Sequence, residues 1–225
     1  MRLSIIVPVF NEAAGIAPAL AALQGLRARG HEVIVADGGS SDATVDEARP
    51  LADSVLASPK GRATQMNAGA RAATGNAFVF LHADTRLPER ADALIEAALA
   101  THHWGRFDVR IDSAHPMLAV VGAMMNLRSR ISGIATGDQA IFVARATFEA
   151  AGGFPTIALM EDIALSASLK RTGRPACLEE KVATSGRRWE NNGVLATIVL
   201  MWRLRLAWFL GANPERLARI YARNG

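Results

Sequence analysis

The stretch that decides the fold is residues 33–42, with the sequence VIVADGGSSD. Its first four residues are apolar and mostly β-branched, which is typical of a strand buried on both faces. Two glycines then permit a tight turn, and the polar residues after them are suitable N-caps for a helix that begins near Ala43. The stretch therefore predicts a strand, a turn and a helix, with the carboxylate of Asp37 at the tip of the strand.

The position of Asp37 suggests a role in a binding site. In open α/β sheets, ligands bind outside the carboxyl ends of the strands. A carboxylate at such a place can also do no more than cap its own turn. The local pattern leaves these two roles of Asp37 equally open.

Similar strand-and-helix units fill the rest of the first half. Apolar runs predict strands over residues 5–10, 33–37, 54–58 and 77–81. Helices are predicted over residues 13–29 (capped by Asn11), 43–52, 63–73 and 88–100 (with Pro88 in the first turn). Strands that alternate with helices at this spacing predict an α/β fold, in which helices cover both faces of a mostly parallel central sheet.

The second half is less regular. Strands are predicted over residues 106–112, 139–143, 176–178 and 182–184, and helices over 116–127, 161–171, 194–210 and 215–223. No stretch has the composition of a linker, so we expect one domain with two lobes over residues 1–225.

Composition and charge limit the classes of protein and partner. The chain is 50% hydrophobic and 20% charged, as in globular proteins. The single cysteine, Cys177, excludes an internal disulfide and fits a reducing compartment. The first apolar run is too short for the core of a signal peptide, so we expect a cytoplasmic protein. A formal charge of +4 favours anionic partners such as phosphates, anionic lipid or nucleic acid, without choosing among them.

Two apolar runs raise the question of membrane contact. Residues 117–125 and 194–202 are each about half as long as the roughly 20 residues that a membrane span needs. Both could form buried helices. The second could instead lie on a membrane surface, with Trp202, Trp208 and Phe209 at the interface.

Acidic residues mark a candidate site. Asp84 directly follows a predicted strand, as Asp37 does, while Glu161 and Asp162 open a helix, where ordinary capping could account for them. Two carboxylates about 4 Å apart repel each other by roughly 4 kcal/mol at an effective dielectric constant near 20. A cluster of these carboxylates therefore predicts a divalent cation, Mg²⁺ or Mn²⁺, and with it a diphosphate.

Two basic segments could meet that diphosphate. Lys60 and Arg62 lie in a glycine-containing loop before a helix, which suits an anion but also fits a solvated surface loop. Arg187 and Arg188 precede Trp189, an arrangement that could equally be a surface cation–π contact.

Six segments, in this order, resemble glycosyltransferase family 2, which has the GT-A fold. The sequence IIVPVFNE at residues 5–12 resembles the first strand and nucleotide-base loop of that family, and residues 35–42 resemble its second-strand motif. His82-Ala83-Asp84 stands at the place of the metal-binding Asp-x-Asp motif. GGF at 152–154 and MED at 160–162 resemble the acceptor-side segment, and RRW at 187–189 resembles the Arg-Trp element of processive members. More narrowly, the chain is similar to a small bacterial subgroup of this family.

The resemblance implies an inverting, metal-dependent transfer of a sugar from a nucleotide diphosphate sugar to a hydroxyl acceptor, which could be lipid-linked. It implies no nucleic-acid partner. A nucleotide-sugar lobe would occupy residues 1–100, an acceptor-side lobe 101–190, and apolar and basic helices 191–225, which could contact the inner face of the membrane.

The resemblance also assigns roles to residues. Those expected to bind the nucleotide sugar are Pro8, Asn11, Glu12, Asp37, Lys60, Arg62, Asp84 and Arg188. Asp84 would hold Mn²⁺ or Mg²⁺, and Asp162 would be the general base, with Glu161 beside it. His82 replaces the first aspartate of the family motif, so it could be a metal ligand, a ribose contact or a plain strand residue.

The sequence fits other functions of proteins with related folds or chemistry less well. A sugar nucleotidyltransferase should have a glycine-rich loop directly after the first strand, where this chain has NEAAG at residues 11–15. A dehydrogenase should have Gly-x-Gly-x-x-Gly there, and a glycosidase with paired carboxylates would not need a nucleotide-type loop. A non-catalytic nucleotide-sugar-binding module of the same fold is the remaining alternative, and the presence of Asp84 and Asp162 argues against it.

Overall fold

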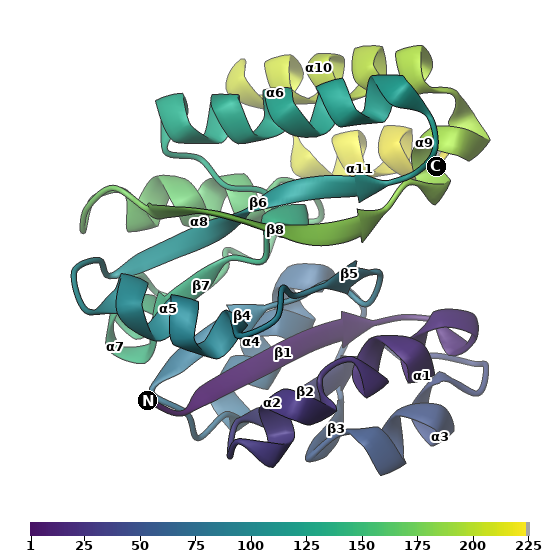
Figure 1. Ribbon diagram of the computed structural model, residues 1–225. Coiled ribbons are helices and arrows are strands. Elements are labelled where there is room, and N and C mark those ends of the chain that lie inside the picture. The colour runs from purple at the N-terminus through teal and green to yellow at the C-terminus, as the bar shows by residue number, and fades with distance from the viewer. Residues whose placement is uncertain (224–225) are drawn as a thin grey trace.

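One mixed sheet of eight strands runs through both halves of the molecule, in the order β3-β2-β1-β4-β7-β6-β8-β5. The computed structural model describes residues 1–223 (Figure 1). The strands are β1 (Leu3–Val9), β2 (Glu32–Asp37), β3 (Ser54–Ala57), β4 (Ala77–Phe80), β5 (Thr85–Arg86), β6 (Trp104–Asp112), β7 (Phe142–Ala144) and β8 (Ala176–Ser185). The helices are α1 (Ala13–Ala21), α2 (Gln24–Ala28), α3 (Thr44–Ala48), α4 (Arg62–Ala72), α5 (Ala91–Leu99), α6 (Pro116–Ser132), α7 (Arg145–Ala150), α8 (Glu161–Leu169), α9 (Arg187–Asn192), α10 (Val194–Phe209) and α11 (Pro214–Arg223).

Burial on both faces explains why the central strands are apolar at most positions. Side chains alternate across a strand. Accordingly, Ile5 and Val7 pack toward α1, α2 and α5, whereas Ile6 packs toward α4, α7 and α8. Each fully buried aliphatic side chain contributes about 1.5–3 kcal/mol to folding. A Cβ atom on Gly69 of α4 would lie 2.4 Å from Ile6, so only glycine permits this close helix–strand contact.

The predicted mostly parallel sheet is confirmed, with a clear difference between its halves. The strands β3, β2, β1 and β4 are all parallel. In the second half only β6 and β8 are parallel, while β7 runs antiparallel to both β4 and β6, and β5 runs antiparallel to β8. An antiparallel neighbour needs no helical crossover, which is why the alternation of strands and helices is lost in this part of the sequence.

Several predicted element boundaries were wrong. The helix predicted over residues 13–29 is two helices, α1 and α2. Asn11 does not cap it: the residue has φ 54°, and Glu12 occupies the N-cap position. Pro88 lies before α5 rather than in its first turn, because α5 begins only at Ala91, after Arg90 in the left-handed region with φ 59°.

The two short strands predicted near residues 176–184 are one continuous strand, β8. A register shift separates the pair Phe107 and Leu178 from the pair Asp108 and Lys181, so β8 carries two extra residues opposite β6. This bulge coincides with the polar sequence EEK at residues 179–181, which interrupts the apolar pattern. The interruption in the apolar pattern therefore divided the prediction into two strands.

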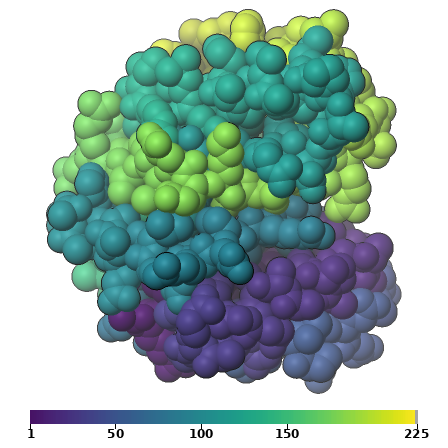
Figure 2. Space-filling model, in the orientation of Figure 1, coloured from purple at the N-terminus to yellow at the C-terminus, as the bar shows by residue number. Residues whose placement is uncertain are grey.

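The C-terminal helices lie at the end of the molecule opposite the first strands (Figures 1 and 2). Helices α6 and α10 run side by side there, and Leu118 of α6 and Val194 of α10 share a small core with Ile111 of β6. Both helices are only half buried. Among the described residues, no helix combines the length and the hydropathy that crossing a membrane requires.

Candidate functional site

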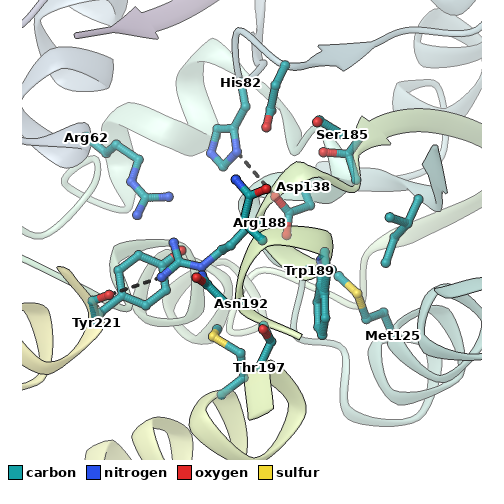
Figure 3. Close-up of a pocket in the computed structure, with 15 residues that line it drawn as sticks. Arg62, His82, Met125, Asp138, Ser185, Arg188, Trp189, Asn192, Thr197 and Tyr221 are labelled. Atoms are coloured by element: carbon teal, nitrogen blue, oxygen red, sulfur yellow. Dashed lines mark hydrogen bonds and ion pairs between the residues drawn. The ribbon is translucent and has the colours of Figure 1, made fainter. Parts of the chain in front are cut away.

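Three adjoining cavities form one cleft between the carboxyl edge of the parallel strands and the C-terminal helices. The largest has a volume of about 440 Å³ and its neighbours have volumes of about 310 and 80 Å³. Arg62, His82 and Tyr221 line all three cavities. Figure 3 shows the largest cavity, with Arg62, Asp138, Arg188 and Tyr221 around it.

The end of the cleft nearest β1 is lined by residues of the first strand and its loop. Pro8 and Glu12 line the 310 Å³ cavity together with Gln65. The side-chain amide of Gln65 donates hydrogen bonds to the carbonyl groups of Val9 (2.7 Å) and Ala36 (2.8 Å). It therefore ties together the carboxyl ends of β1 and β2, the two strands that carry the first two sequence motifs.

The carboxylate of Asp37 is engaged within its own turn. It accepts hydrogen bonds from the backbone N–H groups of Gly39 (2.9 Å) and Ser40 (3.0 Å) and from the Ser40 hydroxyl. Asn11 joins the same loop, because its side-chain oxygen accepts from the Ser41 N–H at 2.9 Å. Both residues hold the loops beside the cleft, and neither belongs to the lining of the three cavities.

Asp84 and Glu12 bring two carboxylates to the same cavity. Burial raises the pKa of Glu12, and the negative charge of Asp84 adds to this effect. Their mutual repulsion is the electrostatic condition under which a cation binds. Among residues 1–223, no three histidine, cysteine or acidic side chains are arranged to hold a metal ion by themselves, so a bound ion would take its remaining ligands from elsewhere, such as a diphosphate.

His82 is paired with Asp138, a residue that the sequence analysis missed. The Nδ1 atom of His82 lies 3.4 Å from a carboxylate oxygen of Asp138 (Figure 3). Burial acts to lower the pKa of His82, but the hydrogen bond and charge of Asp138 outweigh it and raise this pKa. A Cβ atom on Gly137 would lie 2.4 Å from Nε2 of His82. Both ring nitrogens therefore face the loop that carries Asp138.

Glu161 and Asp162 lie at the start of α8, after Met160 in the left-handed region with φ 70°. Glu161 is buried, and its carboxylate lies 3.5 Å from Nε of Arg62. Burial raises the pKa of Glu161, and Arg62 opposes that change. The carboxylate of Asp162 accepts hydrogen bonds from the backbone N–H groups of Gly137 (2.8 Å) and Ile163 (2.7 Å). Both carboxylates line the 80 Å³ cavity.

Arg188, on α9, meets the last helix of the described chain. Its guanidinium group lies 3.5 Å from the centre of the Tyr221 ring, and it donates a hydrogen bond to the Tyr221 carbonyl at 3.1 Å (Figure 3). Lys60 makes a comparable contact, with Nζ 3.6 Å from the centre of the Phe10 ring. The cation–π alternative considered for Arg188 is thus realised, but with Tyr221 rather than with Trp189.

The fold brings most of the predicted site residues into one cleft. Those that line it are Pro8, Glu12, Arg62, His82, Asp84, Glu161, Asp162 and Arg188. Asn11 and Lys60 lie in the adjacent loops, and Asp37 is the last residue of β2. Asp138, Gln65, Tyr221 and Arg205 also line the cleft and were missed. Asp138 had a signal, since Gly137-Asp138 is a turn dipeptide just before an apolar run. Tyr221 had none.

The solved structures with a similar fold include three glycosyltransferase-related examples. S. aureus TarS 1–349 has a TM-score of 0.65 and 19% identity, over 89% of this chain and 66% of that chain. The mannosyltransferase PcManGT from Pyrobaculum calidifontis, in complex with GDP-Man and Mn²⁺, has a TM-score of 0.65 and 22% identity, over 98% and 69% of the two chains. Glucosyl-3-phosphoglycerate synthase from Mycobacterium tuberculosis, with Mn²⁺, UDP and glucosyl-3-phosphoglycerate, has a TM-score of 0.60 and 18% identity, over 81% and 70%.

The length of the match varies. The chain spans between 40% and 66% of the TarS chains that it matches. A comparison with curated proteins found no significant match. Residues 4–117, slightly more than half of the chain, match the family model described as Glycosyl transferase family 2. The fold is therefore of the GT-A type, and the chain belongs to glycosyltransferase family 2.

Proposed function

We propose that this protein is an inverting, metal-dependent glycosyltransferase that moves a sugar from a nucleotide diphosphate sugar to a hydroxyl acceptor. The observation that carries the proposal is the order of groups along the cleft. Pro8 of β1 and Glu12 of the following loop lie at one end, Asp84 and Arg188 in the middle, and Asp162 with Glu161 at the other end, while Arg62 lines the whole length. That is the order in which a nucleoside, a diphosphate and a sugar follow one another in such a donor.

The donor would bind through residues of both lobes. Pro8, Glu12 and Asp37 would contact the nucleoside, with Asn11 supporting the loop. For Asp37 this requires the bonds within its turn to be exchanged for bonds to the base. Lys60, Arg62 and Arg188 would neutralise the diphosphate, since guanidinium groups form paired hydrogen bonds with phosphate oxygens.

A divalent cation fits the chemistry of the cleft. Hard oxygen ligands suit Mn²⁺ and Mg²⁺, and the repulsion between Asp84 and Glu12 leaves a place for positive charge. Asp84 would hold the ion. His82 is less suited to this role, because its ring is already paired with Asp138. When bound, the ion would stabilise the negative charge that develops on the departing diphosphate.

Asp162 would act as the general base. The backbone N–H groups of Gly137 and Ile163 fix its carboxylate at the rim of the small cavity. From there it would accept the proton of the acceptor hydroxyl as the oxygen attacks the anomeric carbon from the side opposite the diphosphate. Glu161 would hold Arg62 in place rather than accept the proton, because it is buried against that arginine.

We also propose that α6 and α10 contact an anionic membrane surface on the cytoplasmic side. Each helix exposes a row of large apolar side chains: Val120, Met124, Leu127 and Ile131 on α6, and Leu195, Val199, Trp202, Leu206 and Phe209 on α10. Because the helices lie side by side, both rows would enter the interface as one apolar face, and Arg203, which is also exposed on α10, would meet the headgroups. Apolar side chains bordered by arginine favour interfacial binding.

Calorimetric titration with UDP and with GDP tests the donor site. We expect binding with Mn²⁺ that weakens at least about tenfold with EDTA or with Asp84→Asn, since that carboxylate would be lost as a metal ligand. Equal affinity in all these conditions would contradict the metal role of Asp84. Hydrolysis or transfer of any donor sugar would exclude the non-catalytic binding module, and formation of a nucleotide diphosphate sugar from a sugar phosphate and a nucleoside triphosphate would instead indicate a nucleotidyltransferase.

A further inference from the structure

Two arginines beside the cleft have buried nitrogen atoms without partners. Nε and Nη2 of Arg128, on α6, and Nε of Arg205, on α10, are shielded from solvent and form no hydrogen bond. Among the described residues, the only other buried side-chain atom in this condition is Nε of Arg188. A buried donor without an acceptor is costly, so this arrangement of two guanidinium groups requires an explanation.

The two guanidinium groups act on each other across the α6–α10 contact. Burial and the charge of Arg205 lower the pKa of Arg128 to about 10, and burial also lowers the pKa of Arg205. Asp162 and Asp138 act on both only through their charge, without a hydrogen bond. The fold therefore holds two positive charges together, and within residues 1–223 it supplies no hydrogen-bond partner for Nε and Nη2 of Arg128 or for Nε of Arg205.

Arg205 lies away from the end of the cleft where the nucleotide sugar is proposed to bind. Arg205 lines the 80 Å³ cavity together with Asp162. Pro8, Glu12 and Asp84, which line the 310 Å³ cavity, do not reach it. An anion at Arg205 would thus lie beyond the candidate base, on the side from which the acceptor must approach.

We infer that the acceptor carries a phosphate group that binds directly to Arg205, with Arg128 adding positive charge behind it, while the acceptor hydroxyl faces Asp162. This inference rests on the proposed transferase function. Two neighbouring guanidinium groups match the double negative charge of a phosphate monoester, and a guanidinium fork fits two phosphate oxygens. The phosphate could belong to a soluble metabolite or to a lipid headgroup, because the shared chemistry is that of the anion.

The test is a calorimetric titration of the full chain with inorganic phosphate. Wild type and Arg203→Gln, which removes an exposed arginine of the same helix, should bind phosphate equally. Arg205→Gln should bind at least about tenfold more weakly and Arg128→Gln severalfold more weakly, since charged hydrogen bonds to phosphate are among the strongest in proteins. Undiminished phosphate binding by Arg205→Gln, or loss of binding in Arg203→Gln as well, would overturn the inference. Circular dichroism and thermal unfolding would show that each variant is folded.

Two further measurements extend the test. The first distinguishes a lipid headgroup from a soluble phosphate, and the second distinguishes failure of this site from failure of the proposed transferase function. Sedimentation with phosphatidylcholine vesicles, with and without phosphatidic acid, should show a preference for phosphatidic acid that Arg205→Gln abolishes if the anion is a lipid headgroup. With a soluble acceptor, phosphate binding stays sensitive to Arg205→Gln but the preference is absent. UDP and GDP titrations of the same variants should be unchanged. Failure of nucleotide binding in wild type would remove the transferase function, whereas failure of the phosphate titration alone would remove only this site.

Discussion

Glu32 in the parallel half and Arg128 beside the cleft are both charged residues that are largely shielded from solvent. They differ in whether the protein supplies hydrogen-bond partners for their charged groups. The carboxylate of Glu32 accepts from the Ser4 hydroxyl, the Thr74 N–H and hydroxyl and the Gly75 N–H. In the described part of the chain, Nε and Nη2 of Arg128 have no hydrogen-bond partner. For both the pKa is lowered, but this favours the charged form of the carboxyl group and disfavours the charged form of the guanidinium. Glu32 is satisfied within the protein, whereas Arg128 keeps buried donors without a partner among the described residues, as the proposed anion site requires.

The largest expected effect concerns the base at the cleft. Asp162→Asn should lower turnover about 100- to 10,000-fold, the usual contribution of a general base, while nucleotide diphosphate binding stays close to that of wild type. Steady-state rates with any donor that shows transfer or hydrolysis would measure this, beside calorimetric affinities.

Glu161→Gln is the matched control, since it changes the neighbouring carboxylate with little change in shape. We expect a milder loss of rate, because Glu161 acts through Arg62. Should Glu161→Gln abolish turnover while Asp162→Asn keeps it, the base is Glu161. Full activity in both variants would mean that this pair of carboxylates is structural.

The second prediction concerns Glu32, the residue of this comparison whose carboxylate has several hydrogen-bond partners. Glu32→Gln should lower the free energy of unfolding by about 2–3 kcal/mol at pH 7, because it weakens several charge-assisted hydrogen bonds. Burial opposes ionisation of Glu32, but these bonds outweigh it and lower the pKa below the ordinary value of 4.5 for a glutamate.

The sign of this shift sets the pH dependence. The stabilisation should be fully present above pH 4.5, the unfolded value, and should be lost as the pH falls through the lower pKa of the folded state. Urea unfolding of both proteins at pH 7 and at pH 3–4 would measure it. A difference between them that grows as the pH falls would show that the charge of Glu32 is not the stabilising element.

The third prediction concerns the apolar face of α6 and α10. The double substitution of Trp202 and Phe209 by serine should weaken sedimentation with anionic vesicles by about tenfold or more, because two exposed aromatic side chains would no longer enter the interface. The side chains are 70% and 86% exposed, so the protein should remain folded. Binding that survives the substitution, or no binding by wild type at low salt, would contradict membrane contact.

The smallest expected effect concerns Arg128, the residue of this comparison whose buried nitrogen atoms lack partners. Arg128→Met should raise the free energy of unfolding by about 1 kcal/mol in the absence of anions, since replacing a buried unpaired charge by an apolar side chain of similar volume removes a desolvation cost. Arg203→Met, at an exposed position, should change it by less than about 0.5 kcal/mol. A clear loss of stability in Arg128→Met would show that this arginine supports the fold.

Much of the fold could be predicted because local sequence records burial and turn chemistry. The parallel strands β1, β2 and β4 are apolar at successive positions since both faces are covered. The antiparallel direction of β7 has no such local signature, because it depends on pairing with β4 and β6. The bulge in β8 was missed for the same reason.

The candidate site likewise has features with a local sequence pattern and contacts that depend on distant residues. By itself the sequence singled out Asp84, Asp162 and the basic loop as candidates for the chemistry, because each stands next to a strand end or a helix start with a recognisable pattern. Only the tertiary structure decided that His82 meets Asp138, that Arg188 meets Tyr221 and that Arg128 lies beside Arg205. Each of these pairs joins residues more than thirty positions apart in the chain. Local propensity does not depend on such distant partners, whereas packing of the helices onto the sheet does.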